Sequence, residues 1–109
     1  EAPAVRAVVC TLPASAGFTL PEWMVDDTAA SKPAVLDVVY KPPLTPLIKQ
    51  AMETGCGYVL GSKMLLEQGV EQSAIWTGRR APRADIAAAL LANMEGQGGL
   101  GVVSQGLNR

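Results

Sequence analysis

Short apolar runs alternate with amphipathic stretches along the chain. Residues Val5 to Cys10 are rich in valine and lead into a Thr-Leu-Pro loop, while Ala34 to Tyr40 is interrupted only by Asp37. A third, shorter run covers Gly57 to Leu60. Runs this rich in β-branched residues are typical of strands that are covered on both faces. The pattern therefore predicts three buried strands.

Helical periodicity fills the segments between and after these runs. Thr45 is a suitable N-cap with Pro46 at the first helical position, and Gly55 is placed to end that helix. Gly78 is placed in the same way after the longest periodic segment. The pattern predicts a short helical turn within 19–27 and helices at 46–54, at 61–77 and from 82 to about 94.

This order of elements determines the expected fold class. Strands that alternate with helices favour parallel pairing through right-handed crossovers. We predict an α/β fold, namely the C-terminal half of a Rossmann-like, doubly wound parallel sheet with flanking helices. Residues 1–95 would form this part of a domain. The Gly- and Gln-rich residues 96–109 are expected to be a flexible tail.

Composition narrows the function classes. The formal charge is -1 with a pI of about 5.3, which gives no basic field for nucleic acid. No apolar stretch reaches the roughly 20 residues that span a bilayer. Without any histidine, Cys10 and Cys56 cannot build a usual zinc site or a Cys/His nucleophile, so buried free thiols are expected. The opening residues lack the features of a secretion signal, so we expect a reducing, cytoplasmic location and a natural chain that continues upstream of Glu1.

Candidate chemistry lies beyond the carboxyl ends of the strands, where ligands bind in such sheets. The loops that qualify are 11–17, 40–45 and 61–64. Tyr40 leaves its strand at that edge, although a tyrosine there also suits packing against a helix. Gly61 would let backbone approach a flat ligand, although a glycine before a helix also suits a simple turn.

Polar residues of the longer helices leave further alternatives open. Met64, Gln68 and Gln72 recur every four residues, and Gln68 either faces solvent or clamps the hydroxyls of a polar ligand through both ends of its amide. Lys63 lies beside the predicted cleft without specifying a reaction, and Asp37 needs partners if it is buried. A solvated role is favoured over a phosphate site for Arg79, Arg80 and Arg83.

Two ordered motifs resemble a known family. The run from Asp37 to Pro42, followed by Thr45-Pro46-Leu47, is similar to the Asp-x-x-Tyr-x-Pro and Thr-Pro-Leu stretch of shikimate dehydrogenases. The run from Gly61 to Gly69, with Trp76-Thr77-Gly78, resembles that family's Gly-x-x-Met-Leu-x-x-Gln helix and its closing Trp-Thr-Gly. Details after Glu67 are most similar to the last domain of the fungal pentafunctional AROM polypeptide.

The resemblance implies NADP-dependent interconversion of shikimate and 3-dehydroshikimate, as part of aromatic amino acid and chorismate biosynthesis. It implies that Tyr40 and Gln68 bind the substrate, and that Thr11, Gly61 and Met64 border the cofactor. Leu60 stands where the family usually has Asp, and Val9-Cys10 replace its Asn-Ala. The Gly-rich turn, the motif that selects the 2′-phosphate and the catalytic Lys and Asp pair belong upstream of Glu1. The resemblance thus implies a fragment that is inactive alone and needs its upstream domains as partners.

Other functions share the same residues. A fungal quinate-pathway repressor also resembles the last part of AROM and would sense shikimate or quinate without catalysis. A quinate dehydrogenase, differing in substrate and in the choice between NAD and NADP, is a closer alternative. A truncated gene product without activity is the third. For the isolated chain, a parallel sheet without its first strands predicts weak stability and self-association.

Overall fold

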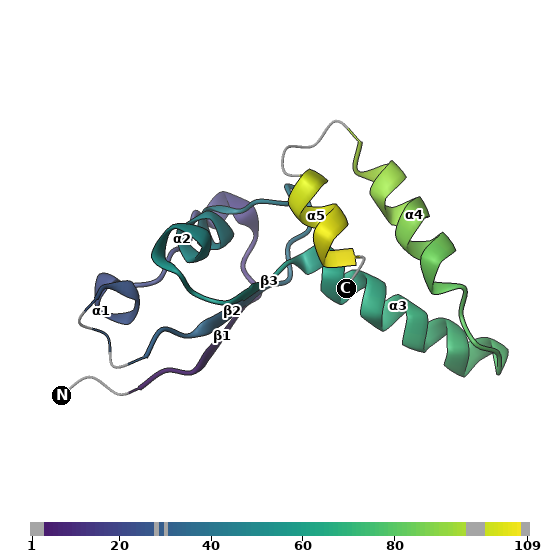
Figure 1. The fold of residues 1–109 in the computed structure, drawn as a ribbon, viewed down its shortest axis with the longest axis horizontal. Helices are drawn as coiled ribbons and strands as arrows, with labels where there is room; N and C mark the ends of the chain where they lie inside the picture. Colours follow the sequence, from purple (N-terminus) through teal and green to yellow (C-terminus); the bar gives the residue numbers. More distant parts are fainter. Residues whose placement is uncertain (1–3, 28, 30, 96–99, 108–109) are drawn as a thin grey trace.

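The computed structural model describes residues 4–27, 29, 31–95 and 100–107, and these form an α/β arrangement (Figure 1). Strands β1 (Ala7–Cys10), β2 (Ala34–Asp37) and β3 (Tyr58–Val59) make one parallel sheet in that order. The predicted parallel α/β fold is therefore confirmed. The helical elements are η1 (Ala14–Ala16), α1 (Glu22–Val25), α2 (Pro46–Thr54), α3 (Gly61–Thr77), α4 (Arg83–Asn93) and α5 (Leu100–Leu107).

The strands are shorter than the apolar runs that predicted them. The second run was expected to continue to Tyr40, yet β2 ends at Asp37. The carboxylate of Asp37 accepts the backbone N–H of Val39 at 3.0 Å, so this donor bonds a side chain instead of a neighbouring strand. The strand therefore ends three residues earlier than predicted, and Tyr40 lies within the loop that follows it.

Helix α2 has the ends that its sequence predicts. The hydroxyl oxygen of Thr45 accepts the backbone N–H of Ile48 at 3.3 Å, and Pro46 occupies the first turn. Gly55 closes the helix with a φ of 80°, in the left-handed region that favours glycine. Leu47, Ile48 and Ala51 are buried, so α2 covers one face of the sheet.

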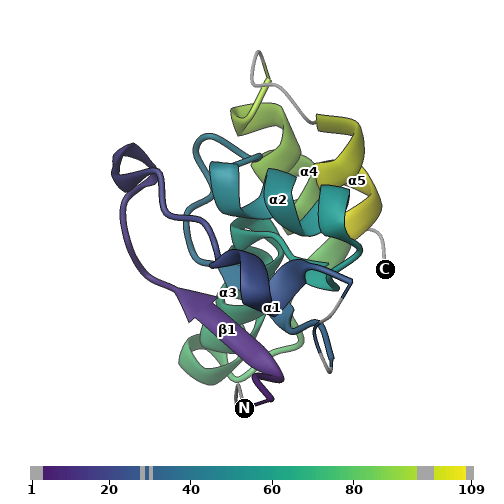
Figure 2. The same cartoon turned by 90° about the vertical axis from the view of Figure 1, so that its left-hand side faces the viewer.

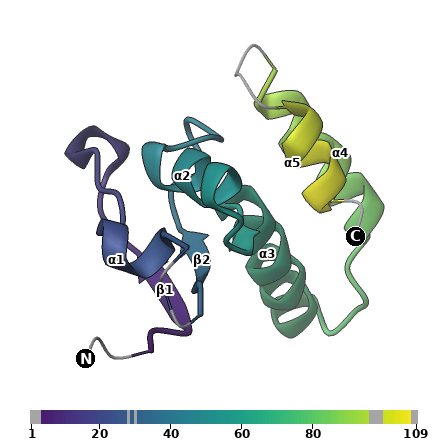
Figure 3. The same ribbon diagram turned by 60° about the vertical axis from the view of Figure 1, so that its left-hand side comes forward.

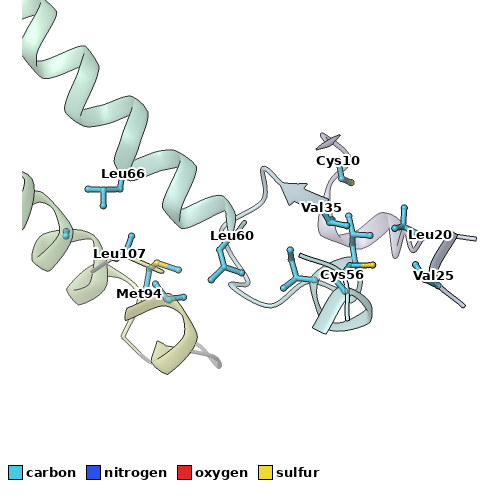
Figure 4. Close-up of a cluster of buried hydrophobic side chains, with 14 residues drawn as sticks. Cys10, Leu20, Val25, Val35, Cys56, Leu60, Leu66, Met94 and Leu107 are labelled. Carbon is cyan, nitrogen blue, oxygen red and sulfur yellow. The ribbon is translucent and has the colours of Figure 1, made fainter. Parts of the chain in front are cut away.

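The molecule is elongated, with principal extents of 50 × 31 × 23 Å. The sheet with α1 and α2 forms one end, while α3 runs away from the sheet and packs with α4 and α5 at the other (Figures 1 and 3). The buried apolar side chains still form one cluster (Figure 4). Leu60, immediately before α3, lies between the Leu66, Met94 and Leu107 side chains and those around Val35.

Helix α5 corrects the prediction of a flexible tail over 96–109. Residues 100–107 are helical, while 96–99 and 108–109 lie outside the described residues. Leu100, Val103 and Leu107 recur at helical spacing, and Val103 and Leu107 are buried against the rest of the core. Gly101 and Gly106 lower helix propensity, and packing of this apolar face overrides that weakness.

One face of the sheet has no helix over it among the described residues. Helices α1 and α2 lie on the other side, and β1 forms one edge (Figures 1 and 2). Val9, Leu36 and Val59 are register partners across the three strands, so they stand in one row on the uncovered face. The side chains of Val9 and Val59 are 61% and 45% exposed. The strands are thus as apolar as strands covered on both faces, yet only one face of this sheet is covered by helices among the described residues.

We expect the chain of 109 residues to self-associate through this bare face, because exposed contiguous apolar surface favours association. Val9→Lys should lower the weight-average mass measured by sedimentation velocity at a fixed concentration. Ile75→Lys removes an aliphatic side chain that is 76% exposed on α3, far along the chain from the sheet, and serves as the matched control. A wild-type chain that stays monomeric, or a mass lowered only by Ile75→Lys, would contradict this prediction.

Candidate functional site

The carboxyl ends of all three strands lie at one edge of the sheet, because the strands are parallel. Thr11 follows β1 directly, Tyr40 follows β2 after two residues, and Gly61 follows β3 after Leu60. Cys10 is the register partner of Asp37, and its carbonyl accepts the N–H of Val38 at 3.1 Å. The loops after β1 and β2 therefore start from neighbouring points, with Thr11 and Tyr40 exposed. The third predicted loop, 61–64, is instead the first turn of α3.

Asp37 fixes the start of the loop that carries Tyr40. Its carboxylate is only 3% exposed, and one oxygen accepts the Thr45 hydroxyl at 2.7 Å while the other accepts the Val39 N–H. Since Thr45 also caps α2, a single buried carboxylate joins the end of β2 to the beginning of α2. The expectation that a buried Asp37 needs partners is confirmed, and its role, which the sequence alone left open, is structural.

Gly61 is buried against the backbone that leaves β2. A Cβ on Gly61 would lie 2.4 Å from the carbonyl oxygen of Val39 and 2.7 Å from that of Val38. The missing side chain thus allows α3 to begin directly against the exit of β2. This differs from the expected reason for the glycine, which was space for a flat ligand, because the space is filled by the protein's own backbone.

Met64 and Gln68 continue the same side of α3 as Gly61. They lie one and two helical turns along, so Gln68 is about 10 Å from Gly61 along the helix axis. Met64 is half-buried and Gln68 is exposed, with its Nε2 donating to the carbonyl of Leu65 at 3.1 Å. A carboxamide has two N–H donors and an acceptor oxygen, so this bond leaves Gln68 able to donate and accept at once.

Glu67 of α3 links two helices through an ion pair. Glu67 pairs with Lys63 at 3.2 Å within α3 and with Arg83 at the start of α4. The Arg83 guanidinium, with a smaller contribution from Lys63, holds the pKa of Glu67 below its ordinary value of 4.5. Arg79 and Arg80 are exposed, which agrees with the solvated role expected for them. The cluster of arginines therefore does not converge on one anion site.

The remaining buried polar and sulfur-containing groups near the sheet are Ser62, Cys10 and Cys56. The hydroxyl of Ser62 is buried without a hydrogen-bond partner among the described residues, and its position in the first turn of α3 gave no signal in sequence. Cys10 and Cys56 are buried free thiols, as predicted. Within ranges 4–27, 31–95 and 100–107, no group of three or more Cys, Asp or Glu side chains is arranged to hold a metal ion. In that same part of the chain, no helix is long and apolar enough to span a bilayer.

Comparison with known proteins shows which family this part of the chain resembles. Residues 61–91, which contain Gly61, Met64 and Gln68, match the family described as Shikimate 5'-dehydrogenase C-terminal domain. The structure is similar to that of Mycobacterium tuberculosis shikimate dehydrogenase, with a TM-score of 0.62 and 34% identity over 83% of this chain and 33% of that one. In its fold and over residues 61–91, the chain is therefore similar to the C-terminal domain of shikimate dehydrogenases.

Two curated proteins are similar to the chain over a longer stretch than the family match. The chain is 49% identical over 55 residues to the pentafunctional AROM polypeptide of Eremothecium gossypii, covering 50% of the chain and 4% of that protein. It is 41% identical over 63 residues to the quinate/shikimate dehydrogenase of Shigella flexneri, covering 56% of the chain and 25% of that protein. The chain thus spans a quarter or less of the length of these relatives.

Gly61→Ala should destabilise the fold, because the new Cβ would clash with the carbonyl oxygen of Val39 and the backbone would have to move. We expect a loss of about 1–3 kcal/mol in the free energy of unfolding, measured by urea denaturation. Gly69→Ala in the same helix is the matched control, since nothing lies within 4 Å of its Cβ position. That variant should gain about 0.5–1 kcal/mol. Equal effects of the two substitutions would show that the close contact does not exist.

Asp37→Ala should also destabilise, because it leaves the buried Thr45 hydroxyl and the Val39 N–H without their acceptor. The expected loss is about 2 kcal/mol in thermal or urea unfolding. Asp27→Ala removes an exposed carboxylate whose contact with Lys32 is 3.8 Å long, and should change stability by less than about 0.5 kcal/mol. If Asp37→Ala were as mild as this control, the buried network would not support the loop.

Arg83→Gln should raise the pKa of Glu67 towards its ordinary value, since Arg83 is the largest cause of its lowering. A carboxyl with a lowered folded-state pKa stabilises the fold above its unfolded-state pKa, and this contribution disappears as the pH falls through the folded-state pKa. The check is a carbon-13 NMR titration of the Glu67 carboxyl. Arg80→Gln, at an exposed arginine nearby in sequence, should leave the Glu67 titration unchanged, and a shift in that control would contradict the assignment.

Proposed function

We propose that this chain forms one wall of the active site of an NADP-dependent shikimate dehydrogenase, which interconverts shikimate and 3-dehydroshikimate. The observation that carries the proposal is that Tyr40 and Gly61 follow neighbouring strands at the carboxyl edge of a parallel sheet, with Met64 and Gln68 on the same side of α3 as Gly61, in a segment that matches this family. The cytoplasmic location belongs to the same proposal.

The substrate contacts in this proposal come from Tyr40 and Gln68. Tyr40 offers a phenolic hydroxyl from an exposed position on the loop after β2, 37% accessible. Gln68 offers an amide that donates and accepts, held by its bond to the Leu65 carbonyl. A polyhydroxylated ring with a carboxylate presents both donors and acceptors, so these two side chains can orient it without providing acid or base.

The cofactor contacts come from Thr11, Gly61 and Met64. When bound, NADP supplies the nicotinamide that exchanges a hydride with the substrate's carbinol carbon. The residues suit such a group: Met64 presents a polarisable thioether at a half-buried position, and Thr11 an exposed hydroxyl at the β1 terminus. Gly61 acts by bringing the start of α3 close to Val39, and thereby sets where Met64 lies. The Lys and Asp pair that handles the substrate proton is expected from residues outside this chain.

Quinate is the second candidate substrate. It is favoured by the relative from Shigella flexneri, whose name gives both quinate and shikimate, and which matches this chain at 41% identity. Tyr40 and Gln68 would make the same kinds of contact with either ring. The choice therefore depends on residues facing the remaining hydroxyls.

The test has two steps on the protein that the complete coding sequence specifies. The residues encoded upstream of Glu1 should include a Gly-rich dinucleotide turn and a Lys and Asp pair. The purified protein should then reduce NADP when shikimate or quinate is added, followed by absorbance at 340 nm. Gln68→Ala should raise KM at least tenfold, whereas Gln72→Ala, one turn further along α3 and also exposed, should leave it unchanged.

Other outcomes separate the alternatives. Saturable binding of shikimate or quinate without NADP reduction would identify a ligand-sensing, non-enzymatic relative. Reduction of NAD in preference to NADP would correct the cofactor. If Gln68→Ala and Gln72→Ala had equal KM values, Gln68 would not be a substrate contact.

A further inference from the structure

Few side chains carry charge in the loops that follow β1 and β2. Residues 11–17 contain no ionisable side chain, and residues 37–45 contain Asp37 and Lys41. Asp37 is buried, and both of its carboxylate oxygens accept hydrogen bonds from the protein itself. Lys41 is exposed beside Tyr40. The loop after β2 therefore presents one cation to a molecule that binds at this edge of the sheet.

The ammonium of Lys41 has one defined neighbour. Its Nζ lies over the Tyr40 ring, 6.0 Å from the ring centroid. This is the outer limit of a cation–π contact, about 6 Å, so the contact restrains the side chain weakly and leaves its N–H donors open. Among the residues that the structure describes, no carboxylate lies at ion-pair distance from this ammonium. The cation is thus placed beside the Tyr40 phenol and is accessible to a ligand.

Neither packing nor the motifs explain this lysine. Its position, directly after Tyr40, is one of the open positions of the Asp-x-x-Tyr-x-Pro pattern. Lys41 also lies outside the walls of a cavity of about 380 Å³ that is enclosed by β3, the start of α3 and α5. A charged side chain on a loop at the edge where ligands bind in such sheets is well placed for recognition.

The ring of the proposed substrate carries several hydroxyls and a single charged group, its carboxylate. Gln68 donates and accepts through a neutral amide, which suits hydroxyls. A carboxylate only accepts, and it is stabilised best by a donor with a positive charge nearby. Tyr40 supplies a hydroxyl donor and Lys41 the charge. Since both groups flank one ring, the ammonium can reach a carboxylate bound at the Tyr40 hydroxyl, or act on it over the Debye length of about 8 Å at physiological ionic strength.

We infer that Lys41 determines specificity for a monocarboxylate: its ammonium pairs with the carboxylate of a hydroxylated ring whose other side faces Gln68. This role rests on the proposed function, because it takes Tyr40 and Gln68 as the substrate contacts. It adds a reason why the acid binds in preference to its neutral ester. Lys41 holds the carboxylate equally in the ground state and in the transition state, so its loss raises KM and leaves kcat unchanged.

The test uses the protein that the complete coding sequence specifies, with shikimate and its methyl ester as probes, or the same pair of quinate compounds where quinate is the better substrate. Lys41→Gln should raise KM for the acid about fivefold, equivalent to about 1 kcal/mol, which is the upper value for exposed ion pairs. It should leave kcat, and KM for the ester, within twofold of wild type. Lys41→Arg keeps the charge and should restore KM for the acid. Lys49→Gln, at an exposed lysine of α2, is the matched control and should change neither KM.

The outcomes distinguish a failure of this role from a failure of the proposed function. If the wild-type protein oxidises the acid with NADP, an unchanged KM in Lys41→Gln, or an equal rise for acid and ester, overturns the role of Lys41 and leaves the proposed function standing. The same rise in Lys49→Gln also overturns it.

If the wild-type protein does not oxidise either acid, the proposed function fails, and dissociation constants measured by calorimetry decide the role of Lys41 instead. Binding of the acid that is weakened in Lys41→Gln, with binding of the ester unchanged, supports it. Equal affinity of wild type and Lys41→Gln for the acid, or no binding of the acid at all, overturns it.

Discussion

The contact between Gly61 and the backbone of Val38 and Val39 is the constraint on which the rest of the structure depends. A carbonyl oxygen 2.4 Å from the missing Cβ permits no other residue without movement. This contact places the first turn of α3 against the exit of β2, and so sets the direction in which the helix leaves the sheet (Figure 1). Everything on α3, from Met64 to the pairing of Glu67 with Arg83, takes its position from that junction.

Asp37 supports the same junction from the other side. Its buried carboxylate ends β2, holds Val39 and orients the hydroxyl that caps α2. Burial of an ionised group is costly unless it is hydrogen-bonded, and here both oxygens have partners. The two features share Val39, so the loop with Tyr40 and the helix with Gln68 are connected through the same backbone segment.

Much of this fold follows from sequence because its signals are local. Thr45-Pro46, Gly55 and Gly78 mark helix ends by side-chain capping and by backbone conformations that glycine adopts easily, and all three lie where predicted. The predicted end of β2 was wrong because a pattern of apolar residues gives no sign of the hydrogen bond from the Val39 N–H to the Asp37 side chain. The prediction of a flexible tail in place of α5 was wrong because Gly101 and Gly106 weaken the helical signal in the sequence. The apolar face of α5 stabilises the helix only through packing against the core. The candidate residues were found by their motifs and by their positions at the strand ends. The need for glycine at position 61 and the cavity beside α5 both arise from contacts between segments that are distant in sequence.

We propose that Tyr40 and Gln68 face the same bound molecule because the Gly61 junction holds their two elements together. Intermolecular nuclear Overhauser effects in the full, isotope-labelled protein test it most directly. One bound shikimate molecule should give cross-peaks from its ring protons to the Tyr40 ring and also to the Gln68 side-chain amide. Cross-peaks to only one of these residues, or to neither, would contradict the account.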